Sequence, residues 1–131
     1  MTEEITPRPA RLERVRRPIA IVHEGFFVYA NPVFLERLGY PSLEDLQAGP
    51  LLDLVEDRDH DRLREHLDAA KKAAGTDQHH PESKLTLRRA DELPLHADCT
   101  SFRTRYAGED CIQLNLRSRE DRSLPQIVGN L

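Results

Sequence analysis

GFFVYANPVFLERLGY, residues 25–40, reads as a strand that leads directly into a short helix with both ends marked. Phe26 to Tyr29 is rich in the aromatic and β-branched residues that strands prefer. Asn31 can accept a hydrogen bond from the free amides of a first helical turn, and Pro32 suits the first helical position. Gly39 suits the left-handed residue that closes a helix. We therefore predict a capped helix of about two turns, and replacing Asn31 by Ala should cost about 1 kcal/mol of stability.

The composition of the chain fits a single globular domain. It has 131 residues, of which 38% are hydrophobic and 32% charged, and its net charge is −4. That charge provides no global field for nucleic acid. No apolar run approaches the roughly 20 residues of a membrane span, and Met1–Glu4 lacks the basic and apolar parts of a signal peptide. We expect a cytoplasmic protein with neither nucleic acid nor membrane as a partner.

The first half of the chain predicts a hairpin followed by helices. Residues 18–22 form a short apolar strand that pairs with the strand over 26–30. Ser42, with an acid three residues later, has the pattern of a capping box. The longest helix should open at Asp57 or Asp59, and its apolar positions recur at i, i+4, i+7 and i+11: Leu63, Leu67, Ala70 and Ala74.

The second half predicts three strands in a meander. Apolar residues alternate with polar ones in three segments, the first at Leu85 and Leu87, then at Leu95, Ala97 and Cys99, and last at Ile112, Leu114 and Leu116. Two strands, several helices and three strands make an α+β fold with five antiparallel strands. If Ala107 and Gly108 form the last hairpin turn, Cys99 lies near Leu116 or Ser118, and Cys111 near Thr104 or Tyr106. That register keeps the two thiols apart, so we expect no disulfide.

This order of elements, over residues 18–121, resembles a PAS domain. The strand-to-helix run carries the resemblance, together with the sequences LGYPS at 38–42, LLDLV at 51–55 and GEDCIQL at 108–114. Two edges depart from the family pattern. Residues 90–93 replace the usual Asp-Gly turn, and residues 117–121 replace the usual Asp-Ile-Thr exit motif.

The resemblance implies a five-stranded sheet with helices packed on one face and a sensory input role in a signal-transduction protein. It also implies a division into an arm at 1–17, the PAS domain at 18–121 and a linker at 122–131. The effector, such as a histidine kinase or a cyclic-di-GMP enzyme, would be a partner in the same or another protein. A small ligand in the core is one hypothesis, and a ligand-free dimerisation module that sets effector geometry is the alternative. A polar group that points into the core, such as Tyr29 or Gln113, would favour the ligand.

The sequence lacks a complete set of residues for the cofactor sites known in the family. Flavin-binding light sensors carry a reactive Cys in an Asn-Cys-Arg motif, which neither Cys99 nor Cys111 has. The axial His of haem-binding members aligns near Arg64, so that His60 and His66 miss it, and we interpret His66 as a half-exposed helix residue. We therefore predict that the protein binds no cofactor.

Metal binding and catalysis also lack a complete set of residues. The acids near Asp57 imitate a calcium loop, but Arg62 stands where that loop needs Gly. His79 and His80 lack a third fixed ligand for a transition metal. No nucleophile motif or phosphate-binding loop is present, so we predict neither a metal site nor enzymatic activity.

Two sets of residues are the candidate functional positions. The ligand-pocket candidates combine apolar character with inward periodicity: Ile21, Tyr29, Phe34, Leu38, Leu54, Leu63, Leu67, Leu87, Cys99 and Leu114. Leu12 and Val15 are an apolar pair in an arm that is otherwise polar and Arg-rich. We expect this pair to be buried in a homodimer built through the arm and the outer face of the sheet.

Overall fold

The computed structural model describes residues 15–72 and 82–118. Two strands come first, β1 (Ile19–His23) and β2 (Phe26–Ala30), followed by the helices α2 (Pro32–Leu38) and α3 (Leu43–Leu46). Two 3₁₀ turns, η1 (Leu51–Leu54) and η2 (Asp57–Asp59), lead into the longest helix, α4 (His60–Lys72). Three further strands complete the described chain: β3 (Glu82–Arg88), β4 (Pro94–Tyr106) and β5 (Glu109–Ser118).

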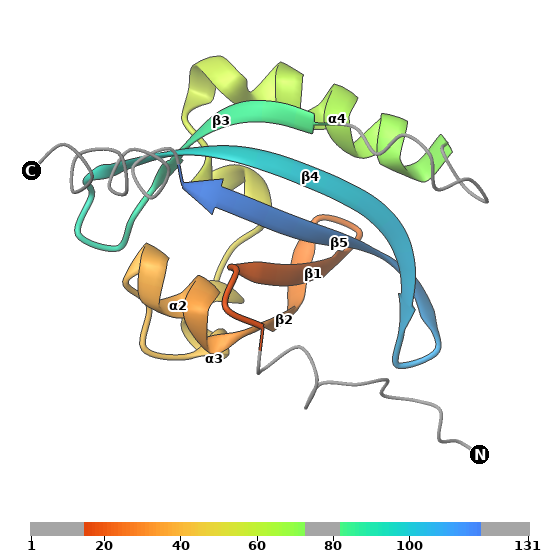
Figure 1. Ribbon diagram of the computed structural model, residues 1–131, viewed down its shortest axis with the longest axis horizontal. Helices are drawn as coiled ribbons and strands as arrows, with labels where there is room; N and C mark the ends of the chain where they lie inside the picture. The colour runs from red at the N-terminus through yellow and green to blue at the C-terminus, as the bar shows by residue number, and fades with distance from the viewer. Residues whose placement is uncertain (1–14, 73–81, 119–131) are drawn as a thin grey trace, which may run out of the picture.

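The five strands form one antiparallel sheet in the order β2-β1-β5-β4-β3 (Figure 1). The first and last strands, β1 and β5, therefore lie side by side in the interior of the sheet. The α+β fold predicted from the sequence is confirmed. Cys99 lies opposite Leu116 and Cys111 opposite Thr104, as the predicted hairpin turn requires. Both cysteines are free thiols.

The helix that follows β2 has the predicted caps. The Oδ1 atom of Asn31 accepts a hydrogen bond from the Phe34 amide at 3.0 Å, and Pro32 occupies the start of the helix. Gly39 closes α2 with φ of +80°, and its amide donates to the carbonyls of Leu35 and Glu36. Local sequence therefore sets the length of α2.

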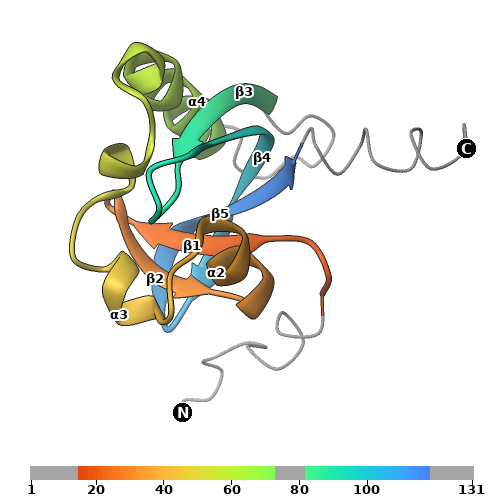
Figure 2. The ribbon, with the colours of Figure 1, turned by 90° about the vertical axis from the view of Figure 1, so that its left-hand side faces the viewer.

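The main core lies between one face of the sheet and all of the helices. Buried residues from α2, α3, η1 and α4 form one apolar cluster with the inward-facing residues of the strands, and Figure 2 shows α3 and α4 along one side of the sheet. We call this side the inner face. On the inner face lie Leu85, Ala97 and Leu114, each of which alternates with residues that point to the opposite, outer face.

Two helix starts lie close to their predicted positions and differ in detail. Asp57–Asp59 forms the 3₁₀ turn η2, and the α-helix proper begins one residue later, at His60. The single helical turn predicted at Ser42 is present as α3 with Ser42 as its N-cap, but the hydroxyl donates to Asp45 Oδ2 at 3.0 Å and accepts no hydrogen bond from the backbone of α3. Within residues 15–72 and 82–118, no helix is long and apolar enough to cross a membrane.

The β4–β5 turn contains a strained residue. Ala107 and Gly108 have φ of +54° and +83°, the left-handed pair that a two-residue hairpin turn needs. Because Ala tolerates this region less well than Gly, we expect Ala107→Gly to raise the free energy of unfolding by about 0.5–1 kcal/mol. Urea denaturation measures this change. Gly108→Ala is the matched control and should lower stability, because Ala is strained at the positive φ of residue 108. No heavy atom lies within 4 Å of the added methyl group, so this backbone strain is the whole effect. A lower stability of Ala107→Gly than of the wild type would contradict the claim that Ala107 is strained.

Candidate functional site

The ligand-pocket candidates divide between the two faces of the sheet. Seven belong to the main core on the inner face: Phe34, Leu38, Leu54, Leu63, Leu87, Cys99 and Leu114. Leu67 is half-buried against the same core. Ile21 and Tyr29 instead form a separate buried cluster with Cys111, on the outer face. The structure therefore brings eight of the candidates together around the inner face and places two away from it.

A small polar cluster lies within this apolar core. His66 of α4 is 3% exposed, and its two ring nitrogens contact hydroxyls on two different strands. Nδ1 is 2.9 Å from Ser83 Oγ of β3, and Nε2 is 2.7 Å from Ser101 Oγ of β4. The Sγ atom of Cys99 lies 3.7 Å from the same Ser101 hydroxyl. We call His66, Ser83, Cys99 and Ser101 the His66 cluster.

The His66 cluster is electrically neutral at physiological pH. Burial lowers the pKa of His66 from 6.5 to about 4, because the charged imidazolium would lose its hydration. Burial also raises the pKa of Cys99 to about 12, so this residue remains a thiol. One nitrogen of the neutral imidazole donates a hydrogen bond and the other accepts one, and each serine hydroxyl can rotate to match. The cluster can therefore offer either a donor or an acceptor without burying a charge.

Sequence periodicity placed His66 incorrectly. The prediction of a half-exposed side chain is wrong, since the buried face of α4 is formed by Leu63, His66 and Ala70. Leu67 lies at the edge of that face and is half-buried. Ser83 and Ser101 were missed altogether. The one available signal for Ser101 was its position two residues after Cys99, which puts both side chains on the same face of β4.

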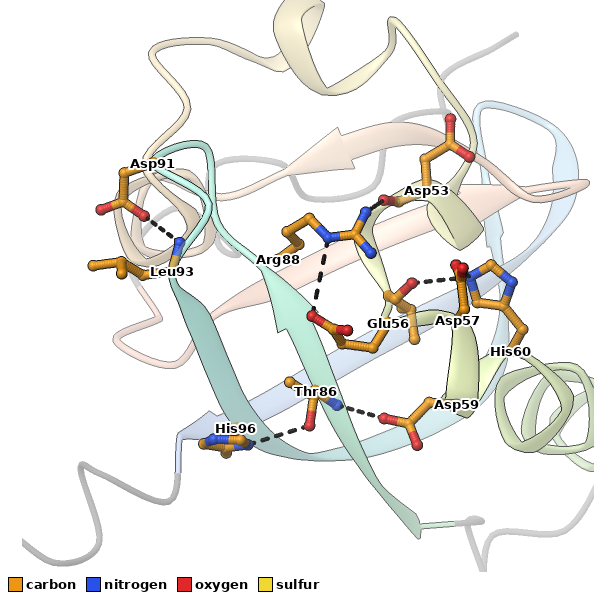
Figure 3. A network of polar contacts seen from close by, with 11 residues as sticks. Asp53, Glu56, Asp57, Asp59, His60, Thr86, Arg88, Asp91, Leu93 and His96 are labelled. Atoms are coloured by element: carbon orange, nitrogen blue, oxygen red, sulfur yellow. Dashed lines mark hydrogen bonds and ion pairs between the residues drawn. The ribbon is translucent and has the colours of Figure 1, made fainter.

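A second set of polar contacts fixes the start of α4 against the edge of the sheet (Figure 3). Asp59 is 5% exposed, and its Oδ2 atom accepts a hydrogen bond from the Thr86 amide at 2.9 Å. Its Oδ1 atom lies 3.1 Å from the Arg62 guanidinium. Val55 bridges Leu87 across the same edge. Asp59 thus holds α4 on β3. This carboxylate, one of the acids that imitate a calcium loop in the sequence, has a structural role.

The other polar and interface candidates lie elsewhere. Tyr29 does not point into the main core; its ring packs on Tyr106, with the centroids 5.9 Å apart. Gln113 lies between Ile112 and Leu114, both inward-facing, and donates to Asn115 Oδ1 at 3.1 Å. Val15 is half-buried, whereas Leu12 falls outside the described residues. His79, His80 and Ala74 also fall outside them. Among the described residues, no three His, Cys, Asp or Glu side chains gather in a way that could hold a metal ion.

Comparison with known proteins agrees with this architecture. Residues 12–74 match the family model described as PAS domain. The PAS domain of a Desulfitobacterium hafniense protein superposes with a TM-score of 0.65 at 21% identity, and the match covers 83% of this chain and 98% of that one.

Two further solved structures give the same result. The PAS domain of an HTR-like protein from Haloarcula marismortui has a TM-score of 0.65 at 17% identity, over 83% of this chain and 89% of that one. The PAS domain of nitrogen regulation protein NR(II) from Vibrio parahaemolyticus has a TM-score of 0.60 at 18% identity, over 86% and 99%. No curated protein matches the chain by sequence. Residues 12–74 thus resemble the PAS domain family in sequence, and the chain has the fold of these PAS domains.

Proposed function

We propose that this PAS domain is the sensory input module of a signal-transduction protein, and that the His66 cluster recognises a small, neutral, hydrogen-bonding ligand. The observation that carries the proposal is a buried imidazole, bonded to two hydroxyls, inside an otherwise apolar core. Polar groups in such a place cost stability relative to apolar packing unless their hydrogen bonds are made. A ligand hydroxyl or amide could replace Ser83 as the partner of His66, while Ser101 stays bonded to the other ring nitrogen and holds the imidazole in place.

The same contacts give a route for the signal. His66 is on α4, while its two partners are on β3 and β4, so their hydrogen bonds hold the helix on the sheet. A ligand that takes over one of these bonds would change the preferred position of α4, and the population would shift accordingly. PAS domains of a two-component sensor histidine kinase and of nitrogen regulation protein NR(II) are among the structural neighbours, which supports a histidine kinase as the class of effector.

A thermal-shift screen against small neutral metabolites tests the ligand. We expect at least one compound to raise the melting temperature of the wild-type chain and to have much less effect on Ser101→Ala, which lacks one hydroxyl of the cluster. Ser42→Ala is the matched control, because Ser42 is half-buried at the start of α3 and its hydroxyl bonds only Asp45, outside the His66 cluster. If every compound that stabilises the wild type stabilises Ser101→Ala equally, the His66 cluster is not the recognition site.

The proposal includes the absence of a coloured cofactor. Serine hydroxyls occupy both ring nitrogens of His66, and the buried thiol of Cys99 is protonated, so neither residue is poised as a haem ligand or a flavin nucleophile. We expect the purified protein to show no absorption between 350 and 500 nm, roughly the range of haem and flavin bands. A Soret or flavin band at stoichiometric intensity would contradict this expectation.

A homodimer is the second part of the proposal. On the outer face, the partly buried Val28 and Tyr106 pack against Ile21, Tyr29 and Cys111, which are buried within the single chain. We assign this half of the sheet, where Val28 and Tyr106 keep some exposed surface, to a second copy. The arm that contains Leu12 and Val15 would add to a contact of about 1,200–2,000 Å².

Truncation of the arm tests the dimer by sedimentation. Asn31 Nδ2 donates to the Arg17 carbonyl at 2.9 Å, so the cut should remove residues 1–14 and keep residues 15–17. We expect the truncated chain to shift toward monomer with an unchanged circular dichroism spectrum. An intact chain that is already monomeric at tens of micromolar would rule out the dimer.

A further inference from the structure

A groove of about 380 Å³ lies where the chain enters β1 and leaves β5. Four arginines from three segments line it, together with two acids: Arg16, Arg17, Arg37, Arg117, Glu82 and Asp98. We call it the arginine groove. Four cations against two carboxylates leave a local charge of +2, on a protein whose net charge is −4. The groove is therefore a positive site on an acidic protein, and local potential rather than net charge governs which small ions gather there.

Three of the groove's guanidinium groups are available to a ligand. Within residues 15–72 and 82–118, Arg16, Arg17 and Arg117 are exposed and make no ion pair. Other arginines of the domain do, as in the pair of Arg64 with Asp61 at 3.1 Å. Like charges held close together repel one another, and an anion between them removes that cost.

The backbone that carries these arginines is fixed before any ligand arrives. The Arg17 carbonyl accepts from Asn31 Nδ2 at 2.9 Å, which ties residues 15–17 to the start of α2. The Leu116 amide donates to the Pro18 carbonyl at 3.0 Å, which ties the same segment to β5. Both views place the segment before β1 and the end of β5 on the same side of the domain (Figures 1 and 2). A preorganised site loses less entropy on binding than a mobile one.

The arginine groove is separate from the other features of the domain. Asp98, Thr100, Asn115 and Arg117 lie on the outer face of β4 and β5, opposite the face that holds His66. They also lie away from Ile21 and its apolar neighbours, since Asn115 pairs with Ile19 and Arg117 lies still farther along β5. Occupation of this groove would therefore not depend on the His66 cluster.

We propose that the arginine groove binds a small ligand through a phosphate group. A guanidinium presents a planar fork of N–H donors that matches phosphate oxygens, and a phosphate dianion has enough oxygens and charge to engage several arginines from different segments at once. A carboxylate has only two oxygens and a single charge, which suits one or two arginines. The volume of about 380 Å³ lies within the range of small-molecule sites. The bound phosphate would link α2, the segment before β1 and the end of β5.

Titration of the full chain with inorganic phosphate and pyrophosphate, at constant ionic strength, tests the groove. Isothermal calorimetry measures the affinity, and ¹H–¹⁵N spectra locate the site. We expect saturable binding, with the largest amide shifts at residues 16–18 and 115–117. Arg17→Gln and Arg117→Gln should each weaken binding by about tenfold or more. Arg64→Gln is the matched control on α4 and should bind as the wild type does.

Three results would overturn the assignment. The first is the absence of saturable binding by either phosphate compound. The second is an equal loss of affinity in Arg64→Gln and Arg117→Gln, which would mean that only the general field of the protein attracts the anion. The third is citrate binding as tightly as pyrophosphate, which would exclude selectivity for phosphate. Because Arg17→Gln and Arg117→Gln leave the His66 cluster intact, failure here is distinguishable from failure of the proposed sensory function.

Discussion

Replacing Asn31 by Ala should lower the free energy of unfolding by about 3 kcal/mol, well above the roughly 1 kcal/mol of an ordinary helix cap. Asn31 is fully buried, and its Oδ1 atom accepts from both the Phe34 amide and the Ile19 amide at 3.0 Å. Its Nδ2 atom donates to the Arg17 carbonyl. The variant therefore loses the cap of α2. It also leaves the Ile19 amide and the Arg17 carbonyl without their hydrogen-bond partner.

Urea denaturation of two further variants separates these contributions. Asn31→Asp keeps the acceptor for Phe34 and Ile19 but loses the donor to Arg17, so its stability should fall between the wild type and Asn31→Ala. Ser42→Ala is the matched control, because Ser42 caps α3 without a side-chain bond to the backbone. We expect it to change stability by less than about 0.5 kcal/mol. Equal losses in Asn31→Ala and Ser42→Ala would mean that the contacts of Asn31 contribute nothing special.

Acid should destabilise this domain through His66. The pKa of His66 is about 4 in the folded protein, below the 6.5 of an unperturbed histidine, because burial disfavours the imidazolium. The unfolded chain therefore binds more protons between these two values. Stability is fully present above pH 6.5, falls as the pH drops toward 4, and stops changing through this group below 4. The total loss is about 3 kcal/mol, at about 1.4 kcal/mol for each pH unit.

His66→Gln gives the matched comparison, since it keeps hydrogen-bonding capacity and removes the titrating group. Stability should be measured for both proteins at several pH values from 7.5 to 4 by chemical denaturation. The difference between the wild type and His66→Gln should shrink by about 3 kcal/mol over this range. If the two plots of stability against pH are parallel, His66 titrates alike in the folded and unfolded chains. The claim that its imidazole is buried and neutral would then be wrong.

Local signals in the sequence were enough to predict the order of elements. Asn31, Pro32 and Gly39 each act on the residues next to them, so the capped helix follows from the sequence alone. The alternation of Ile112, Leu114 and Leu116 identified their common face because one face of β5 is apolar and the other polar. Such patterns need no knowledge of distant contacts.

The faces of β1 and β2 could not be assigned in this way. Every residue from Ile19 to Val22 is buried, so alternation does not distinguish the two faces of β1. An irregularity between Ile21 and Val22 also shifts the pairing with β2. Ile21 and Tyr29 therefore lie opposite each other on the outer face, away from the other ligand-pocket candidates.

The His66 cluster depended on contacts between residues far apart in sequence. Ser83 and Ser101 meet His66 across separations of 17 and 35 residues, and a polar residue on a helix gives no sign of which way it faces. The helical pattern favoured Leu67 over His66 because it counted only apolar side chains. The arginine groove was hidden for a similar reason, since Arg37 and Arg117 join the Arg-rich arm only in the folded chain.

Native mass spectrometry of the purified chain, beside Ser101→Ala, most directly tests the claim that the His66 cluster holds a ligand. For the wild type, we predict a species heavier than the 15.0 kDa chain by the mass of a small molecule that is released on denaturation. Ser101→Ala should lack that species or carry much less of it. A wild-type chain that shows only its own mass, or the same added mass at equal abundance in both proteins, would contradict the account.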